Sequence, residues 1–88
     1  MNYSVSYTPK AIEEDIPFLD KAVTERVQAA IERKLMIDPI RFGKPLQHDW
    51  AGARSLRVGD YRIVYEVDMK THSILVRAVG HRSCIYEQ

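Results

Sequence analysis

The sequence predicts an α+β domain with two N-terminal helices packed on one face of a small, mainly antiparallel sheet, in the order β-α-α-β-β-β. Two observations support this fold class. Apolar residues recur at three- and four-residue spacing within residues 20–38, which indicates an amphipathic helix. Strand-like segments in the last third of the chain flank Gly59-Asp60, which favours a tight hairpin between antiparallel strands.

The composition indicates a single globular domain over residues 1–88. Apolar residues make up 45% of the chain and charged residues 28%, with a net charge of +1, so neither a disordered chain nor a strongly basic nucleic-acid binder is predicted. The only cysteine, Cys84, can form neither an internal disulfide nor a cysteine-based zinc site, which favours a reducing, cytoplasmic environment. No apolar segment approaches membrane-spanning length, and we expect no membrane partner.

The first part of the chain predicts a strand followed by a helix. Residues 2–7 alternate polar and apolar side chains, as in a strand half-buried against a core. Thr8 followed by Pro9 is typical of a helix start, and Pro17 is expected to kink or end that helix. The acidic residues 13–15 are expected to lie in water near the helix start, where the helix dipole favours negative charge.

A second helix is predicted to begin after Asp20 and to stop at Asp38-Pro39, because the residue before a proline avoids helical dihedral angles. Its apolar stripe consists of Val23, Val27, Ala30, Ile31 and Leu35. Residues 39–52 show no stable period and are expected to form a long loop. We expect this loop to be pinned to the core by Phe42, Leu46 and Trp50.

The two-residue turn at Gly59-Asp60 sets the register of a hairpin between residues 54–58 and 61–67. The expected cross-strand pairs are Val58 with Tyr61, Arg57 with Arg62, and Leu56 with Ile63. Because side chains alternate across a strand, the helices should cover the face that holds Leu56, Val58, Tyr61, Ile63, Tyr65 and Val67. The hydroxyls of the two tyrosines are expected to lie in water.

A third strand is expected over residues 74–80, and residues 84–87 can add a short edge strand. Strict alternation places one set of apolar residues on the core side of the third strand: Ile74, Val76 and Ala78. It places Arg77 and His81 on the other side. Glu66 on the neighbouring strand is therefore expected to pair with Arg77.

The exposed face of the hairpin is predicted to hold Arg57 and Arg62 directly opposite each other. Two opposed arginines repel each other, so the arrangement favours a site that binds an anion unless a carboxylate neutralises it. With Glu66 assigned to Arg77, these two arginines have no obvious acidic partner. The guanidinium group presents a planar fork of donors that matches phosphate.

The segment after the last strand brings His81, Arg82 and Tyr86 together, since Gly80 permits a bend. An imidazole, guanidinium groups and a phenol suit RNA cleavage without a metal ion or cofactor. A base removes the proton of the ribose 2′-OH, arginines stabilise the charge that grows on the phosphate, and an acid protonates the leaving 5′-oxygen. The expected product is a 2′,3′-cyclic phosphate. The three histidines lack ligand-like spacing, so no metal site is expected.

Residues 54–68 (RSLRVGDYRIVYEVD) and 76–86 (VRAVGHRSCIY) resemble the RelE family of toxins in bacterial and archaeal toxin–antitoxin systems. RFGKPL at residues 41–46, with the WAG that follows, is typical of the loop these toxins carry before the hairpin. The resemblance spans nearly the whole chain. Its LRVGDYR…Y core is specific to the RelE/ParE superfamily and less specific for a branch within it. It implies a microbial-RNase-like sheet backed by two N-terminal helices.

The resemblance also implies ribosome-dependent endonuclease cleavage of mRNA in the A site, with no cofactor. The implied partners are the ribosome with its mRNA and a cognate antitoxin whose chain wraps the toxin. Toxin and antitoxin together usually repress their own operon, so operator DNA is expected as a partner only through the antitoxin.

By position, Arg62 matches the family arginine assigned to phosphate stabilisation, and Arg82 matches the arginine after the final strand. Tyr86 matches the C-terminal tyrosine thought to stack on or orient the substrate base. His81 lies where some members have lysine, and it becomes the candidate general base because an ordinary imidazole titrates near neutral pH. The residues expected to bind RNA are Arg54, Arg57 and Lys44.

Two departures from the family pattern leave other functions open. Ser55 occupies one place of the family's basic pair on the first hairpin strand, and a net charge of +1 is low for a ribosome binder. One alternative is a ParE-like toxin that inhibits DNA gyrase through a protein interface and cleaves no RNA. The other is a degenerate member that acts only as an antitoxin partner or operon co-repressor.

Overall fold

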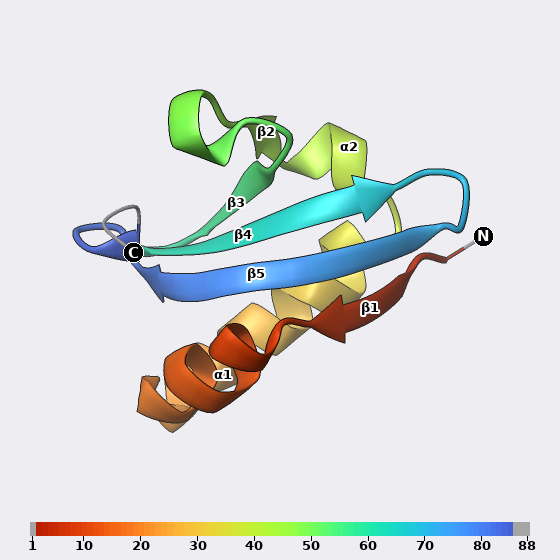
Figure 1. The fold of residues 1–88 in the computed structure, drawn as a ribbon. Coiled ribbons are helices and arrows are strands. Elements are labelled where there is room, and N and C mark those ends of the chain that lie inside the picture. The colour runs from red at the N-terminus through yellow and green to blue at the C-terminus, as the bar shows by residue number, and fades with distance from the viewer. Residues whose placement is uncertain (1, 86–88) are drawn as a thin grey trace.

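The computed structural model describes residues 2–85, which form a five-stranded sheet and the helices that pack on it (Figure 1). The strand order is β1-β5-β4-β3-β2, with β1 parallel to β5 and the other pairs antiparallel. The predicted α+β class is confirmed. In chain order the elements, with η for 3-10 and π turns, are β1 (Ser4–Tyr7), η1 (Ala11–Asp15), η2 (Ile16–Phe18), α1 (Lys21–Ala30), η3 (Ile31–Leu35), α2 (Pro39–Phe42), β2 (Lys44–Pro45), η4 (His48–Trp50), β3 (Arg54–Val58), β4 (Tyr61–Asp68) and β5 (Ser73–His81).

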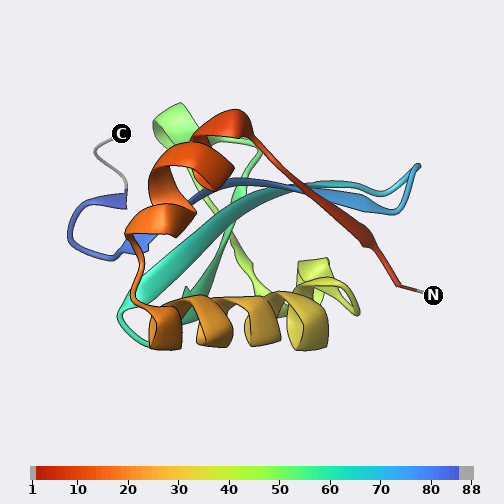
Figure 2. The same ribbon diagram turned by 90° about the horizontal axis from the view of Figure 1, so that it is seen from below.

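The first helix begins and ends where the sequence predicts. The amide of Ala11 donates to Oγ1 of Thr8 (3.2 Å), and after η2 the backbone returns to an extended conformation at Leu19. Pro17 lies in η2 and has no N–H to donate to the carbonyl one turn earlier, so regular helical bonding stops there. The chain can then cross to the start of α1 on the same side of the sheet (Figure 2).

The carboxylate of Asp15 joins this first helix to the sheet. Asp15 is only 9% exposed, and it accepts hydrogen bonds from the amide of Val79 (3.0 Å) and from Nζ of Lys10 (3.0 Å). The expectation that residues 13–15 all lie in water is therefore wrong for Asp15. The physical reason is that β1 ends opposite Val76. Within residues 2–85, β5 therefore has no strand partner on that side at Val79, and Asp15 supplies the acceptor.

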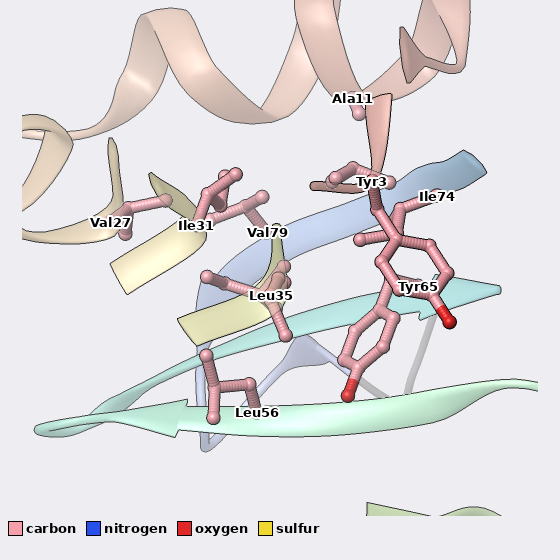
Figure 3. Packing of buried hydrophobic residues seen from close by; sticks show 11 residues of the cluster. Tyr3, Ala11, Val27, Ile31, Leu35, Leu56, Tyr65, Ile74 and Val79 are labelled. Atoms are coloured by element: carbon pink, nitrogen blue, oxygen red, sulfur yellow. The ribbon is translucent and has the colours of Figure 1, made fainter. Parts of the chain in front are cut away.

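The second helix is continuous through α1 and the π turn η3. Asp20 occupies the predicted N-cap position, although its side chain makes no capping hydrogen bond. The predicted apolar stripe faces the sheet, and its buried members are Val27, Ile31 and Leu35. Together with the sheet they form the main core (Figure 3), whose buried residues are Tyr3, Ala11, Val27, Ile31, Leu35, Leu56, Ile63, Tyr65, Ile74, Val76 and Val79.

The β3–β4 hairpin has the predicted register, with Arg57 opposite Arg62. Gly59 has a φ of 60° in the turn, a backbone conformation that favours glycine. The pairing of β4 with β5 departs from strict alternation, because Val64 faces Ala78 whereas Tyr65 faces Val76. The additional residue on β5 forms a β-bulge, which inverts the alternation of the residues beyond it.

Because of this bulge, two residues lie on a different face of the sheet from the one predicted. Ala78 lies not with Val76 in the main core but with Val64 in a smaller cluster on the opposite face. His81 is the register partner of Tyr61, so it shares the face of Tyr61 and not that of Arg62. A sequence pattern of strict alternation contains no signal for one inserted residue.

The second cluster consists of Ala53, Val64, Ala78 and Ile85, with Leu46 and Trp50 packed against it. The predicted pinning of the segment before β3 is thus confirmed for Leu46 and Trp50. It is wrong for Phe42, whose side chain is 39% exposed. Residues 84–85 lie in no strand, so the expected edge strand is wrong there, and residues 86–87 of that prediction lie outside the described residues.

The predicted loop over residues 39–52 is wrong, because this segment contains α2, β2 and η4. Asp38 accepts a hydrogen bond from the amide of Arg41 (3.1 Å), and Pro39 occupies the first turn of α2. Both residues are favourable at a helix start. The same dipeptide that stops one helix therefore begins the next.

A buried tyrosine holds α2 against the sheet. Tyr65 is fully buried, and its hydroxyl donates to the carbonyl of Pro39 (2.6 Å), so the expectation of a hydrated hydroxyl is wrong. Nη2 of Arg54 donates to the carbonyls of Ile40 (2.6 Å) and Gly43 (2.8 Å). A side chain at Gly43 would collide with the tyrosine ring, so glycine permits this close approach. Burial raises the pKa of Tyr65, and the Arg54 guanidinium opposes part of the rise.

Tyr65→Phe is expected to lower the free energy of unfolding by about 1–2 kcal/mol, because the buried carbonyl of Pro39 loses its donor. Tyr61→Phe is the matched control, since Tyr61 is half-buried and its hydroxyl makes no hydrogen bond within the described part of the chain. It should change stability by less than about 0.5 kcal/mol. Urea unfolding measures both variants, and equal costs would contradict the anchoring role of the Tyr65 hydroxyl.

The raised pKa of Tyr65 also predicts a pH dependence of stability. Above pH 10.0, the ordinary tyrosine value, the unfolded chain releases the phenol proton while the folded chain retains it, so the free energy of unfolding falls as the pH rises. Tyr65→Phe should therefore lose less stability than the wild type between about pH 9 and pH 11. Unfolding curves at several pH values measure the difference, and parallel losses would contradict the prediction.

Asp15→Ala is expected to lower the free energy of unfolding by about 1–3 kcal/mol, because the buried amide of Val79 loses its acceptor. Glu14→Ala is a suitable control, since Glu14 is the exposed neighbour of Asp15. Hydrogen exchange at the Val79 amide reports the contact directly and should accelerate only in Asp15→Ala. Unchanged protection of that amide would show that Asp15 is not its essential partner.

Candidate nucleic-acid interface

A groove lies at the edge of the sheet formed by β2 and β3. Because β2 pairs only with Arg54 and Ser55, the rest of β3 has no strand on that side within residues 2–85. The groove has a volume of about 560 Å³ and is lined by Lys34, Phe42, Lys44, Pro45, Leu46, Ser55, Leu56, Arg57 and Arg62. This lining, which we call the basic groove, has four cationic side chains and no carboxylate among the described residues. A concave surface with one sign of charge concentrates ligands of the opposite sign.

The hairpin turn orients the two arginines of this groove. Nε of Arg57 donates to the carbonyl of Gly59 (3.2 Å), and Nη1 of Arg62 donates to the carbonyls of Gly59 (3.4 Å) and Tyr61 (3.1 Å). Neither guanidinium forms an ion pair with a carboxylate of the described residues. Within residues 2–85 no carboxylate therefore compensates the positive charge of the opposed pair, as an anion site requires.

The nearby carboxylates are engaged elsewhere. Glu66 accepts from Nη1 of Arg77 (2.8 Å), which confirms the predicted pair. Asp60 lies 3.8 Å from Nε of Arg82, with both side chains largely exposed. An exposed pair at this distance is weak and leaves the Arg82 guanidinium accessible to another anion.

A second concavity of about 400 Å³ lies where the hairpin turn meets the end of β5, and it is lined by Arg62, His81, Arg82 and Ser83. We call it the terminal hollow. The amide of Arg82 donates to the carbonyl of Asp60 (2.8 Å), which ties the segment after β5 to the hairpin turn. Arg62 lines both the basic groove and the terminal hollow, so it connects the two groups of candidate residues.

The imidazole of His81 is held by its neighbours. Its Nδ1 accepts from the amide of Ser83 (3.1 Å) and lies 2.8 Å from Oγ of the same residue, while its ring contacts Tyr61 edge-on at 5.4 Å. An Nδ1 that accepts from an amide fits the neutral tautomer with its proton on Nε2. In this arrangement Nε2 is a hydrogen-bond donor, and the lone pair of Nδ1 is occupied.

The structure thus brings most of the predicted site residues into two adjoining surfaces. Lys44, Arg57 and Arg62 line the basic groove, and Arg62, His81 and Arg82 line the terminal hollow. Arg54 is not with them, because its guanidinium bonds to the carbonyls of α2. Tyr86 lies outside the described residues.

Two further cations come from the second helix, one into the basic groove and the other against the hairpin turn. Lys34, expected to lie in water, lines the basic groove. The guanidinium of Arg26 lies so close to Gly59 that a side chain at that glycine would collide with it. Both positions look like ordinary hydrated helix positions in the sequence, and only the packing of the helix on β3 reveals their place.

Within residues 2–85, no group of three or more histidine, cysteine or acidic side chains is arranged to hold a metal ion. None of the helices in this range has the length and apolar character needed to cross a bilayer.

Sequence comparison places the chain among known toxins. Residues 5–86 match the family described as "ParE toxin of type II toxin-antitoxin system, parDE". The toxin RelG of Mycobacterium tuberculosis is 33% identical over 88 residues, which cover 100% of both chains. The toxin RelE of the same organism is 33% identical over 84 residues, covering 96% of this chain and 86% of the relative.

Solved structures have the same fold. The toxin–antitoxin complex RelBE2 of M. tuberculosis contains a chain with a TM-score of 0.86 and 32% identity, and the match covers 93% of this chain and 100% of that chain. The isolated E. coli RelE toxin matches with a TM-score of 0.73 and 21% identity, covering 90% and 83% of the two chains. At 21% identity, the similarity to E. coli RelE supports a common fold and no statement about function.

Proposed function

The chain belongs to the RelE/ParE family of type II toxins, and we propose that it is a ribosome-dependent endoribonuclease that cleaves mRNA. The observation that supports this activity is the position of Arg62, which lines both the basic groove and the terminal hollow. A strand held by its phosphates in the groove would thereby present one phosphate to the candidate catalytic residues of the hollow. Arginine and lysine are the side chains that bind RNA phosphates best.

The proposed reaction is an internal transfer. The ribose 2′-oxygen loses its proton to a base and bonds to the adjacent phosphorus, while the bond from phosphorus to the 5′-oxygen breaks and an acid protonates that oxygen. The products are a 2′,3′-cyclic phosphate and a 5′-hydroxyl. In this proposal, Arg62 and Arg82 stabilise the negative charge that builds on the phosphate oxygens, and the reaction needs no metal ion or cofactor.

The contacts of His81 define what this residue can do in the reaction. With Nδ1 accepting from the Ser83 amide, the imidazole offers an Nε2–H donor that suits a phosphate oxygen. For His81 to act as the general base, Nδ1 must first release Ser83. Tyr86 completes the proposed site as the residue that stacks on or orients the substrate base, and Lys44 and Arg57 bind the RNA backbone along the groove.

The proposed partners follow from the relatives. Similar chains were solved as toxin–antitoxin complexes from M. tuberculosis, E. coli and Methanococcus jannaschii. We therefore propose a cognate antitoxin as the physiological partner, with operator DNA reached only through that complex. The ribosome and its mRNA are the proposed targets, and the proposed location is therefore the cytoplasm.

A second candidate is inhibition of DNA gyrase without RNA cleavage. The specific observation in its favour is that the matching family is described as ParE toxin. Ser55 also interrupts the basic pair that nucleases of this family carry on the first hairpin strand. Under this reading the two concave surfaces would bind protein and not RNA.

Primer extension on a reporter mRNA after induced expression tests the proposal. Wild-type protein is expected to produce cuts at in-frame codon positions. Arg62→Ala and Arg82→Ala should each reduce cleavage about 10²–10³-fold, because a charge-stabilising group at the phosphate is lost. Arg33→Ala is the matched control, since this exposed arginine lines neither concavity, and it should cleave as the wild type does.

The other outcomes separate the remaining functions. Growth arrest with intact mRNA and an induced DNA damage response would reject the nuclease and favour gyrase as the target. Normal growth after expression of the folded protein, without any cleavage, would indicate a degenerate member that acts only with its antitoxin.

A further inference from the structure

Among the described residues, Phe42 is the one aromatic ring in the lining of the basic groove, which also presents four cations. It ends α2, lines the basic groove and is 39% exposed, and it belongs to neither hydrophobic cluster. A phenylalanine that stays partly exposed lacks part of the stabilisation that full burial of its ring would give. In a concave surface lined by cations, such a ring is suited to contact with a ligand.

The backbone under this ring is fixed. Arg54 donates to the carbonyls of Ile40 and Gly43, which lie on either side of Phe42, and Tyr65 holds Pro39 at the start of the same short helix. The ring is therefore presented by a preorganised segment. Preorganisation reduces the entropy lost when a ligand binds.

Cationic side chains surround the ring. Nζ of Lys34 lies 5.9 Å from the ring centroid and Cζ of Arg41 lies 5.7 Å from it. Both distances are close to the outer limit of about 6 Å for a cation–π contact, so neither cation is tightly bound to the ring. Both side chains are long and exposed, and they can turn from the ring to a phosphate.

We propose that Phe42 is a stacking platform for one nucleobase of a single-stranded RNA, with Lys34 and Lys44 holding the phosphates beside that base. Aromatic side chains combined with a cationic groove are the means by which proteins bind single-stranded nucleic acid, because every base has a π face and every nucleotide has a phosphate. Since the same groove contains Arg62, the stacked base belongs to a nucleotide near the phosphate that is cleaved. This inference rests on the proposed function, for which it names the way the substrate is held.

The charge of the groove favours RNA over a protein ligand. An apolar protein segment would gain from Phe42, Leu46 and Leu56 but would leave the four cations of the lining desolvated without partners. A strand of RNA satisfies both parts of the lining at once, because its bases and phosphates alternate along the chain.

Binding of a 12-nucleotide single-stranded RNA tests the platform directly. All its riboses carry 2′-O-methyl groups, so it cannot be cleaved. Fluorescence anisotropy at low salt should show that Phe42→Ala binds about 5- to 100-fold more weakly than the wild type, the loss expected for one stacked base. Phe42→Leu should be as weak as Phe42→Ala, because it is apolar but has no π face. Phe42→Tyr should bind within about twofold of the wild type, since it keeps the ring.

A spectroscopic signature distinguishes stacking from a general loss of packing. In Trp50→Phe/Phe42→Trp the only tryptophan is at the platform, and stacking on a base should quench its emission when RNA is added. The Trp50→Phe/Phe42→Ala protein, which contains no tryptophan, supplies the baseline. Emission unaffected by saturating RNA would overturn the platform. Thermal unfolding of each variant verifies that the fold is intact.

Lys34→Ala, paired with Arg33→Ala as control, tests the adjacent cation. Only Lys34→Ala should lower the affinity for RNA. It should also reduce the slope of log affinity against log salt concentration by about one, because one fewer counterion is released. Equal salt slopes in the two variants would contradict a phosphate contact at Lys34.

The cleavage assay keeps this inference separate from the proposed function. A wild-type protein that cleaves mRNA, with Phe42→Ala binding and cleaving equally well, would overturn the platform and leave the nuclease standing. If the wild-type protein cleaves no mRNA, the proposed nuclease activity is rejected. The binding measurements with the 2′-O-methyl oligonucleotide still test the stacking role of Phe42. If Phe42→Ala weakened antitoxin binding and left RNA binding unchanged, the groove would be a protein docking surface, which would also overturn the inference.

Discussion

The groove of this protein depends on a few polar contacts between the sheet and the segment around α2. The Arg54 guanidinium binds the carbonyls of Ile40 and Gly43, and the Tyr65 hydroxyl binds the carbonyl of Pro39 in a buried contact. An unpaired buried carbonyl costs free energy, so these contacts determine where the segment rests. They hold Phe42 and Lys44 in the lining of the groove, which also contains the arginines of the hairpin. The contacts of Tyr65 and Arg54 thereby position side chains of the basic groove.

The hairpin places two like charges in register, and the rest of the strand pair compensates for their repulsion. The helix-facing residues beside Arg57 and Arg62 are Leu56 and Ile63, both buried in the main core. Burial of apolar surface there stabilises the pairing by more than the opposed arginines destabilise it. Because the arginines project from a rigid ladder and not from a loop, the distance between them varies little. A surface that binds an anion benefits from such rigidity.

Local rules were sufficient for much of the fold and for part of the site. The hairpin register followed from a two-residue turn, and the stripe ending at Leu35 followed from helical spacing. Contacts between distant segments were not predictable in this way. The bulge that turns His81 toward Tyr61, the burial of Asp15 by Val79, and the docking of Lys34 beside β3 all depend on where other elements end. The arginine pair and Lys44 were accessible from the sequence, whereas the places of Phe42 and Lys34 in the groove were not.

The incomplete cover of β3 has a consequence for the protein in its free form. Beyond Ser55, this strand presents an edge that β2 does not cover, and exposed strand edges are templates for pairing between copies of a chain. Lys44 and Arg57 lie beside this edge, so two copies approaching through it would bring like charges together. The cations of the groove therefore also oppose self-association. Removing them to weaken ligand binding would lower the colloidal stability of the protein as well, whereas a change at Phe42 would leave this protection in place.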